Sequence, residues 1–496
     1  MRSHYIGGKW IEGREFVPIV SPHSGRPVGE TAVGGVEEVA FAVDAARAAL
    51  PGWRALSVRE RRDYLEKLSE QLKLGYGEEG QSTPLKRRIM DAVGKPLLEA
   101  DIEVIESASF IDYFASIADE ILAPRDIQLN KDLWPTKRST VFFEPVGVVG
   151  IIKPWNYPLE MPVWSLAPAL LAGNTVVLKP SEKSPSIGEA IAQMIELADF
   201  PPGVVNVVAG DKSTGKFLVT NPGTSMIAFT GSVTAGREIA ETCGRLLKRA
   251  SLELGGNDAA IVLSDVDLDL AANGLTWGAF CNAGQVCVGV KRVIVVKSIA
   301  NQLIQKLTAR AKELRLGTDV GPLVDREQLD AVAKTVDLAI AEGAKLEYGG
   351  RRVEGLEGFY FHPTILTGLQ PTALLLMEEC FGPVMPIVVV DDAAAAVVEA
   401  NRSNYGLGAS VWTADTLTAE ALAKELRVGM VWINDVNVAF AEAPWGGTRD
   451  SGIGFELSPE VLLEFVTRKH LNVETSSDTK RFWWYPYKGD SEIVKH

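Results

Sequence analysis

The 496-residue sequence predicts an α/β protein with two domains, and three observations support this. From residue 142 onward, β-branched runs such as TVVL and MIAFT alternate with amphipathic stretches such as SIGEAIAQMIELA, an order typical of βαβ units around a parallel sheet. A second series begins after Gly255, with AAIVL, a helical stretch from Leu268 to Cys281, and RVIVVKS. The chain also exceeds what one hydrophobic core usually serves. We therefore expect two α/β domains with a boundary near Gly255 and Gly256.

Helical periodicity precedes the first strand series. Apolar residues recur at helical spacing over residues 36–50 and again over residues 58–74. The Gly-, Glu- and Ser-rich residues 75–84 predict a loop, and the helical pattern resumes near Leu85. Residues 121–140 contain two prolines and the alternating run RDIQLN, which predict an extended arm. The C-terminal KHLNVETS can pair with this arm or with another subunit.

Composition argues against several classes of function. The 50 Lys+Arg and 64 Asp+Glu give a net charge of -14, which repels nucleic acid and anionic lipid surfaces. We see no signal peptide and no apolar stretch of membrane-spanning length. The four cysteines and five scattered histidines predict neither a disulfide framework nor a zinc site. We expect a cytosolic protein with reduced thiols and no metal, either a small-molecule enzyme or a structural protein.

Cys287 is the candidate nucleophile. It lies in FCNAGQVCVG, where Gly284 and small neighbours allow a sharp turn and an accessible thiol beside backbone N–H groups. This pattern alone is weak, because most cysteines are small buried hydrophobes. We adopt that buried interpretation for Cys243, Cys281 and Cys380, and we expect Cys281 on the apolar side of the preceding helix.

A thiolate that attacks a carbonyl group needs a base and an oxyanion donor. Glu253 ends an apolar strand and precedes two glycines, a confined setting that raises a carboxyl pKa. A helix-start carboxylate or a strand-end salt bridge is the alternative for this residue. Asn156 lies between the two prolines of PWNYP, so its amide can be a fixed oxyanion donor, or the segment can be only a rigid turn.

A nucleotide site is predicted at the ends of two strands. GSVTAG lies between the strand MIAFT and a helix, an order that favours a pyrophosphate at the helix N-terminus. KPSE follows the strand TVVL and places Lys179 and Glu182 where α/β sheets bind ligands. A carboxylate there accepts hydrogen bonds from ribose hydroxyls and repels a 2′-phosphate. Alternatively, Ser181 and Glu182 only begin the next helix.

Eight motifs occur together: PWNYP, LKPSE, FTGS with GSVTAG, ELGGN, FCNAGQVC, EECFGPV, NYGLGA and PWGGTRDSGIG. In order and approximate spacing they resemble the aldehyde dehydrogenase superfamily, from about Tyr5 to about Lys469. The resemblance implies two Rossmann-type α/β domains and a β-strand oligomerisation arm. The expected divisions are an NAD-binding domain of residues 1–124 and 146–254, a catalytic domain of residues 255–450, and an arm and tail of residues 125–145 and 466–496.

The resemblance also implies a role for individual residues. Cys287 would form a thiohemiacetal and then a thioester, Asn156 and the Cys287 N–H would hold the oxyanion, and Glu253 would activate the hydrolytic water. The residues expected to bind NAD are Ile152, Lys179, Ser181, Glu182, Gly231, Ser232, Leu254, Glu379 and Phe381. The residues expected to line the substrate pocket are Tyr157, Trp164, Cys281 and Trp445. Glu253 favours hydrolysis, because CoA-acylating relatives generally lack this glutamate.

Two positions depart from the family pattern. Many relatives have Lys directly after the counterpart of Trp164, where it can approach the counterpart of Glu456. This chain has Ser165 instead, which puts any proton path through that lysine in doubt. Phe455 stands where a basic residue usually precedes the glutamate.

The substrate is less well defined. The expected aromatic residues suit an apolar aliphatic or aromatic aldehyde, and they can also surround a cationic betaine aldehyde or aminoaldehyde. EAPWGG and the aromatic tail RFWWYPYK resemble betaine and aminoaldehyde dehydrogenases, but those relatives often have Trp in place of Cys281. The sequence gives the apolar aldehyde a small preference.

Two alternative functions are CoA-dependent acylation and a structural role without catalysis. CoA-dependent acylation is disfavoured by Glu253. A catalytically silent structural protein is disfavoured because Cys287, Glu253 and Asn156 are all present. We expect NAD as the preferred cofactor with NADP as a weaker alternative, a homodimer or homotetramer, and no binding to nucleic acid or membranes.

Overall fold

The computed structural model describes residues 1–478, 480–481 and 483–486, and one large sheet organises its first half. Its strands are, in spatial order, β2 (Lys9–Glu12), β1 (Ser3–Ile6), β9 (Val205–Val207), β8 (Thr175–Lys179), β7 (Val148–Ile152), β10 (Met226–Thr230), β11 (Arg249–Glu253) and β20 (Gly452–Ile453). The five strands from β9 to β11 are parallel, and those at the two edges pair antiparallel.

A second sheet organises the other half. Its strands are, in order, β14 (Lys345–Tyr348), β15 (Thr364–Thr367), β16 (Val384–Val390), β13 (Arg292–Val296), β12 (Ala259–Val262), β17 (Gly408–Trp412) and β18 (Met430–Ile433). Only the β14–β15 pair is antiparallel. The two largely parallel sheets confirm the predicted α/β class. Sheet membership changes between β11 and β12, and the domain limits given above stay a prediction.

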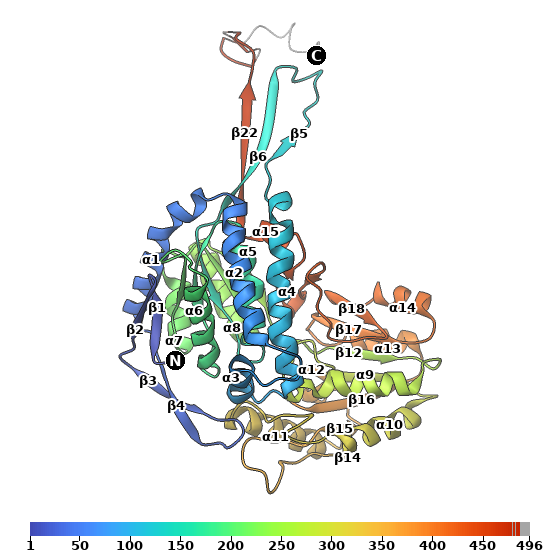
Figure 1. Ribbon diagram of the computed structural model, residues 1–496. Helices are drawn as coiled ribbons and strands as arrows, with labels where there is room; N and C mark the ends of the chain where they lie inside the picture. Colours follow the sequence, from blue (N-terminus) through green and yellow to red (C-terminus); the bar gives the residue numbers. More distant parts are fainter. Residues whose placement is uncertain (479, 482, 487–496) are drawn as a thin grey trace.

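Helices pack against both sheets, as Figure 1 shows. Those of the first half are α1 (Val36–Ala55), α2 (Val58–Tyr76), α3 (Pro84–Val93), α4 (Leu97–Ile121), α5 (Glu160–Leu171), α6 (Pro185–Leu197), α7 (Lys212–Thr220) and α8 (Val233–Leu246). Those of the second half are α9 (Leu268–Phe280), α10 (Ala300–Glu313), α11 (Arg326–Ala341), α12 (Leu374–Met377), α13 (Ala393–Ala400) and α14 (Thr416–Ala423). Every residue of β7, β8 and β10 is buried, which is why these strands read as continuous apolar runs.

The predicted loop of residues 75–84 is shorter in the structure and is held by buried partners. α2 extends to Tyr76, and α3 begins at Pro84. Lys86 Nζ donates to the carbonyl of Glu78 (2.8 Å), and Gly80 N donates to Asp101 Oδ2 (2.8 Å). These bonds fasten the loop to α3 and α4.

The helix before the candidate nucleophile ends one residue earlier than expected. α9 stops at Phe280, and residues Cys281–Gly284 form a short 3-10 turn, η1. Asn282, Ala283 and Gly284 all have positive φ, an uncommon conformation for the first two residue types. Cys281 is therefore a helix cap beside a tight turn and not a residue on the helix face, which corrects its expected place.

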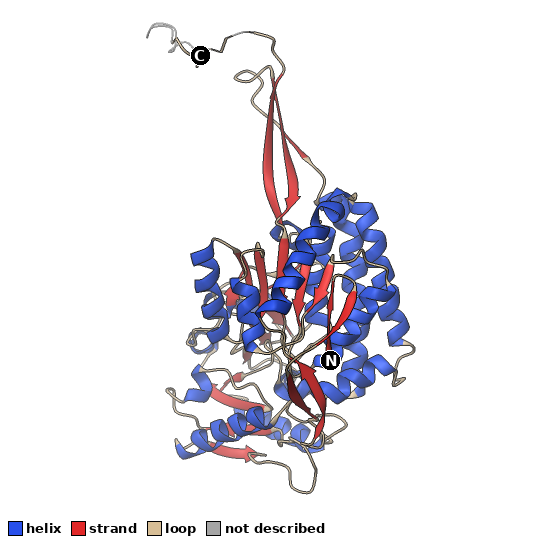
Figure 2. Cartoon of the chain, turned by 90° about the vertical axis from the view of Figure 1, so that its left-hand side faces the viewer, coloured by secondary structure: helices blue, strands red, loops and turns tan. Residues whose placement is uncertain are grey.

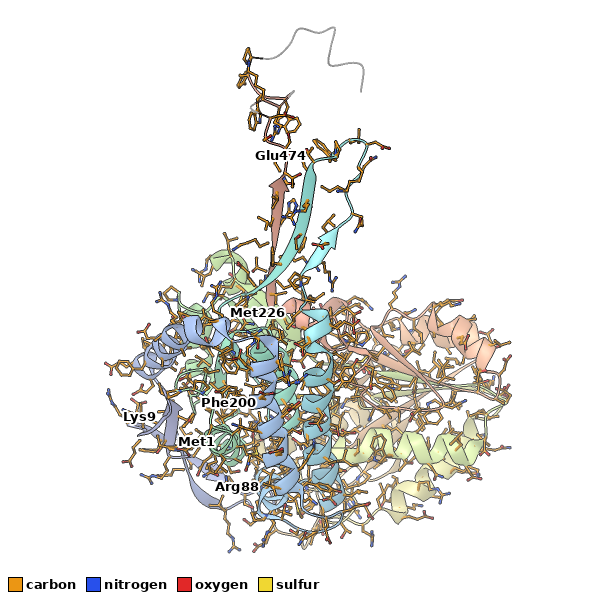
Figure 3. The ribbon with its side chains drawn as sticks, turned by 45° about the horizontal axis from the view of Figure 1, so that its top comes forward. Met1, Lys9, Arg88, Phe200, Met226 and Glu474 are labelled. Atoms are coloured by element: carbon orange, nitrogen blue, oxygen red, sulfur yellow. The ribbon has the colours of Figure 1, made fainter. Side chains whose placement is uncertain are left out.

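The predicted arm is a three-stranded sheet of order β22-β6-β5 that projects from the body (Figures 1 and 2). β5 (Arg125–Ile127) and β22 (Val466–Glu474) each pair antiparallel with β6 (Lys137–Pro145), so the C-terminal strand pairs within its own chain. Figure 3 places Glu474 far out on this arm, where it forms salt bridges with Lys137 and Arg481. Residues 479, 482 and 487–496 of the predicted tail lie outside the described residues.

Six further short elements are described. They are β3 (Phe16–Val20), β4 (Pro27–Ala32), β19 (Pro444–Trp445), η2 (Arg449–Ser451), β21 (Glu456–Leu457) and α15 (Val461–Glu464). Among the described residues, no helix combines the length and apolar character that a membrane crossing needs.

Candidate active site

Three neighbouring parallel strands end at the same edge of the first sheet and bring polar side chains together there. Lys153 directly follows β7, Thr230 ends β10 and Glu253 ends β11, with Thr230 and Glu253 in register. The carboxyl ends of parallel strands are where α/β sheets place their ligands. This edge is therefore the first part of the site.

The loop that carries Cys287 is clamped against the PWNYP segment. Asn156 Nδ2 donates to the carbonyl of Gln285 (3.0 Å), and Asn282 Nδ2 donates to the carbonyl of Asn156 (3.0 Å). Gln285 Oε1 accepts from Val324 N (2.9 Å). A primary amide has two N–H groups, so Asn156 keeps one for another acceptor beside the Cys287 loop.

Cys287 is a free, half-buried cysteine. Burial raises its pKa far above the usual value, and the nearby carboxyl groups of Glu379, Asp258 and Glu253 raise it further. A hydrogen bond from the Val288 N–H opposes this effect. A base or a cation must therefore assist the thiol before it can attack.

Glu253 has the burial and the raised pKa that suit a general base. Its side chain is buried, and neither carboxyl oxygen has a hydrogen-bond partner among the described residues. Burial raises its pKa well above the usual value, the charge of Glu456 adds to this, and Lys153 opposes it. A buried carboxyl group whose oxygens have no hydrogen-bond partner can take and release a proton.

The two departures noted in the sequence lie close to Glu253. Ser165 Oγ donates to Glu456 Oε1 (2.7 Å), and the same carboxylate forms a buried salt bridge with Lys153. Lys153 Nζ also donates to Thr230 Oγ1 (2.8 Å). Phe455 is half-buried and packs against the main hydrophobic core.

A tunnel of about 170 Å³ ends at Cys287. The structure places all four residues expected in the substrate pocket on its wall: Tyr157, Trp164, Cys281 and Trp445. The rings of Trp164 and Trp445 meet edge to face with their centroids 5.2 Å apart. Aromatic rings thus form part of the wall, together with aliphatic residues such as Met161 and Val286.

Carboxyl groups also line this tunnel, which the sequence analysis did not foresee. Glu99, Glu106 and Glu160 lie on the wall, and buried Glu103 lies beside them. Burial raises the pKa of Glu160 well above the usual value, with a further increase from Glu106 and then Glu103. One oxygen of Glu160, Oε2, has no hydrogen-bond partner among the described residues. Burial also raises the pKa of Glu106, and that of Glu99 to about 7.

One lysine offsets part of this acidic cluster. Lys95 Nζ donates to Glu103 Oε2 (2.6 Å) and lies 3.4 Å from the centroid of the Tyr157 ring. Glu103 Oε1 also accepts from the backbone N–H of Leu159 (2.9 Å), so Glu103 is well satisfied. Lys95 is therefore bonded to Glu103, and Glu160 keeps one carboxyl oxygen, Oε2, without a hydrogen-bond partner among the described residues.

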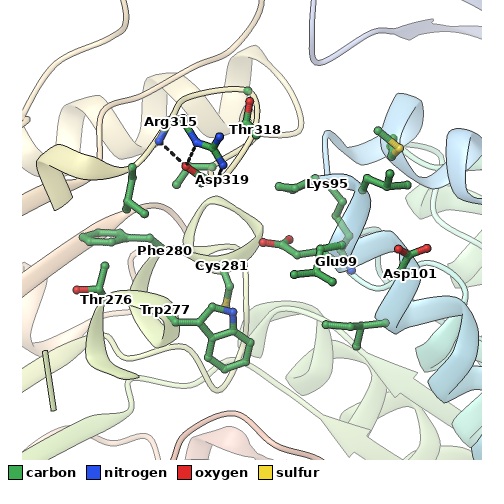
Figure 4. A pocket seen from close by; sticks show the side chains of 18 of the residues that line it. Lys95, Glu99, Asp101, Thr276, Trp277, Phe280, Cys281, Arg315, Thr318 and Asp319 are labelled. Carbon is green, nitrogen blue, oxygen red and sulfur yellow. Dashed lines mark hydrogen bonds and ion pairs between the residues drawn. The ribbon is translucent and has the colours of Figure 1, made fainter. Parts of the chain in front are cut away.

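A wider chamber of about 820 Å³ adjoins the tunnel (Figure 4). Glu99, Trp277 and Cys281 line both cavities, so the chamber and the tunnel are adjacent. Arg315 and Asp319 form a bidentate pair on its rim, with N–O distances of 2.8 and 2.7 Å.

A third cavity, of about 470 Å³, opens above the ends of β7, β8 and β10. Six of the residues expected to bind NAD line it: Ile152, Lys179, Ser181, Glu182, Gly231 and Ser232. Ser232 caps α8 by accepting from Ala235 N (3.3 Å), and the free N–H groups at a helix start favour an anion. Lys179 Nζ bonds to Glu182 Oε2 (3.1 Å) in this cavity.

The other three expected NAD residues do not line that cavity. Leu254 packs beneath α8, so close to Gly236 that a Cβ there would lie 2.4 Å from Leu254 Cδ2. Glu379 lies against Gly255, and its buried Oε1 has no partner among the described residues. The ring of Phe381 meets that of Trp155 with centroids 5.6 Å apart.

The environment of Glu379 suits a polar ligand group. Burial raises the pKa of Glu379 to about 7. A buried, unpartnered acceptor here and an anion site at α8 fit the two parts of a dinucleotide.

The sequence analysis missed the acidic cluster and Lys153 for different reasons. Glu99, Glu103 and Glu106 have spacings of four and three residues in helix α4, which places them on one face, and this signal was readable. Lys153 contacts Glu456, 303 residues away in the chain, and no local pattern predicts such a contact.

The chain is similar to known proteins over nearly its whole length. The model described as "Aldehyde dehydrogenase family" matches residues 10–471. The chain is 36% identical to the betaine aldehyde dehydrogenase of Bacillus subtilis, with 94% of this chain and 96% of that protein covered. It is 38% identical to the phenylacetaldehyde dehydrogenase of Pseudomonas fluorescens, with 94% of each covered. The structure of a betaine aldehyde dehydrogenase from Staphylococcus aureus with NAD+ superimposes with a TM-score of 0.93 at 32% identity, covering 98% of this chain and 96% of that one.

Proposed function

The chain belongs to the aldehyde dehydrogenase family, and we propose that it oxidises an aldehyde to a carboxylic acid with NAD through a thioester on Cys287. The observation that carries this proposal is the pairing of two groups near one another. The Cys287 thiol ends the tunnel, and the unpartnered Glu253 carboxyl is close enough to raise the pKa of that thiol. A nucleophile and a base are the two groups that thioester formation and hydrolysis require.

The residues divide the reaction between them. Glu253 accepts the thiol proton, the sulfur of Cys287 bonds to the carbonyl carbon, and the remaining N–H of Asn156 and the Cys287 N–H stabilise the resulting oxyanion. Bound NAD+ supplies the hydride acceptor. Glu253 releases the thiol proton to solvent and then takes a proton from water, whose oxygen attacks the thioester carbon. The acid leaves as the bond between that carbon and the Cys287 sulfur breaks.

We propose NAD as the preferred cofactor on the basis of Glu182. Its carboxylate can accept from ribose hydroxyls and would repel a 2′-phosphate. Lys179 is bonded to Glu182 and reduces that repulsion, whereas Lys183 is paired with Asp325 (2.6 Å). We therefore expect a preference for NAD over NADP and not the exclusion of NADP.

Glu182→Gln should narrow the difference between the two cofactors. Removing the negative charge is expected to raise kcat/KM for NADP about tenfold, with a smaller effect on NAD. Initial rates at varied cofactor concentration measure this. Glu241→Gln is the matched control, because Glu241 lines the same cavity from α8. A wild-type protein with a higher kcat/KM for NADP than for NAD would contradict the role of Glu182.

For the substrate, we propose a cationic aldehyde such as an aminoaldehyde. The support is the unpartnered Glu160 in a tunnel whose aromatic walls also attract cations. The apolar aldehyde that the sequence slightly favoured stays the second candidate. The Trp164 and Trp445 rings and the likeness to a phenylacetaldehyde dehydrogenase support that alternative.

A matched substrate pair separates these two candidates. Protonated 4-aminobutanal should have a kcat/KM at least about tenfold above that of pentanal, its neutral counterpart of equal length. Glu160→Gln should remove most of this difference by weakening the amine contact, while pentanal serves as the internal control. NADH formation gives the rates, and chromatography without coenzyme A should detect the carboxylic acid. Faster turnover of pentanal by wild-type protein would favour the apolar candidate.

The assembly and location also stay proposals. Most of β22 is exposed on the projecting arm, and an exposed strand is a common surface for association. We propose that the arm joins copies of the chain into a homodimer or homotetramer, and that the protein is cytosolic.

A further inference from the structure

A buried lysine, Lys153, lies near Glu253, and the sequence analysis did not single it out. Lys153 directly follows β7, and its side chain is fully buried. Its ammonium group contacts Thr230 Oγ1 and the carboxylate of Glu456. A buried ammonium is costly unless it is paired and hydrogen-bonded, and both partners are present here.

The two carboxyl groups near Lys153 are not equivalent. Glu456 Oε1 accepts from Ser165 Oγ and Lys153 Nζ. Glu253 accepts no hydrogen bond from a described residue. The cluster thus holds one cation for two carboxyl groups, and Glu253 is the one whose oxygens both lack a hydrogen-bond partner among the described residues.

The position of Lys153 also matters for the nucleotide cavity. Its neighbours Ile152 and Pro154 line that cavity, and so does Lys153 itself. Ser165, in contrast, is on α5, next to Trp164 of the tunnel wall. The ammonium group therefore reaches Glu456 from the nucleotide side of the site, while α5 contributes only a hydroxyl group.

We propose that Lys153 is a positioning residue. From the end of β7 it supplies the positive charge beside Glu456 that Ser165 does not supply, and it thereby sets the pH at which Glu253 can act as a base. The inference rests on the proposed base role of Glu253. The titratable groups that face Glu253 are Lys153, Glu456 of β21 and the thiol of Cys287. Of these, only Lys153 is a cation, and it lowers the pKa of Glu253.

Loss of this cation should move the pH profile in a defined direction. Without Lys153, the pKa of Glu253 rises, so the pH below which Glu253 is protonated and inactive also rises. Lys153→Met should shift the acid limb of steady-state kcat to higher pH by about one unit. The pre-steady-state burst of NADH should remain at a pH above the shifted limb. A salt bridge that only stabilises the fold would alter the melting temperature without moving this limb.

A charge exchange guards against loss of folding in the single variant. Lys153→Ser should shift the limb as Lys153→Met does, and adding Ser165→Lys should return it toward the wild-type position, because Ser165 and Lys153 bond to the same oxygen of Glu456. Lys248→Met, at another lysine with buried partners, is the control and should leave the limb in place.

Folded Lys153→Met protein with a wild-type acid limb would overturn the proposal. So would a double variant that folds but keeps the shifted limb of Lys153→Ser. Failure of the base role of Glu253 can be told apart from failure of the Lys153 proposal. If Glu253 is not the base, the Glu253→Gln protein should turn over normally, whatever the acid limb of the Lys153 variants.

Discussion

Cys287→Ala is expected to reduce NAD-linked aldehyde oxidation by about 10⁴-fold or more, because no carbon–sulfur bond can form. The thiol contributes chemistry and not cofactor affinity, so the Kd for NAD should change less than about twofold. NADH absorbance measures turnover, and titration calorimetry measures binding.

Cys243→Ala is the matched control for this loss. Cys243 is a buried cysteine in α8 that lines none of the three cavities described, and its replacement should retain turnover. Normal oxidation by the Cys287→Ala protein would exclude Cys287 as the nucleophile.

Glu253→Gln is expected to stop the reaction after its first half. Acylation and hydride transfer should still give an NADH burst approaching one equivalent per active site when a buffer base removes the thiol proton. The steady rate should then fall by about 10³-fold, since no carboxylate activates water. Rapid mixing measures both phases, and mass spectrometry should detect the acyl group on the Cys287 peptide.

The pH dependence of the wild-type protein gives a second measure of Glu253. Burial raises its pKa, so the neutral form persists to a higher pH than for an ordinary carboxyl group. Steady turnover should therefore fall as pH decreases through this raised pKa. No burst in Glu253→Gln together with unchanged steady turnover would remove Glu253 from the base role.

Local pattern was sufficient to predict the strands and their chemistry-bearing ends. β7, β8 and β10 are continuous apolar runs, because helices cover both faces of their sheet. The same regularity placed Glu182 near the end of one strand and Glu253 at the end of another, where ligands bind. Motif order then predicted the family and singled out Cys287.

Helix endings were predicted less accurately, because tertiary contacts decide them. The run before Cys287 has helical periodicity, yet α9 ends at Phe280, and Asn282 and Ala283 adopt positive φ. Bonds from Asn282 to Asn156, and from Asn156 to Gln285, hold that turn. Sequence periodicity carries no information about partners so far along the chain.

By itself, the sequence determined the α/β class, the order of the strands along the chain and the residues at their ends, because burial and backbone periodicity are local properties. Tertiary structure alone decided which charges share an interior. It brought Glu160 to the acidic face of α4, paired Lys153 with Glu456, and joined β22 to β6. The physical reason is that pKa values and charge pairing depend on distance in space and on exclusion of water, and the spacing of residues along a chain specifies neither.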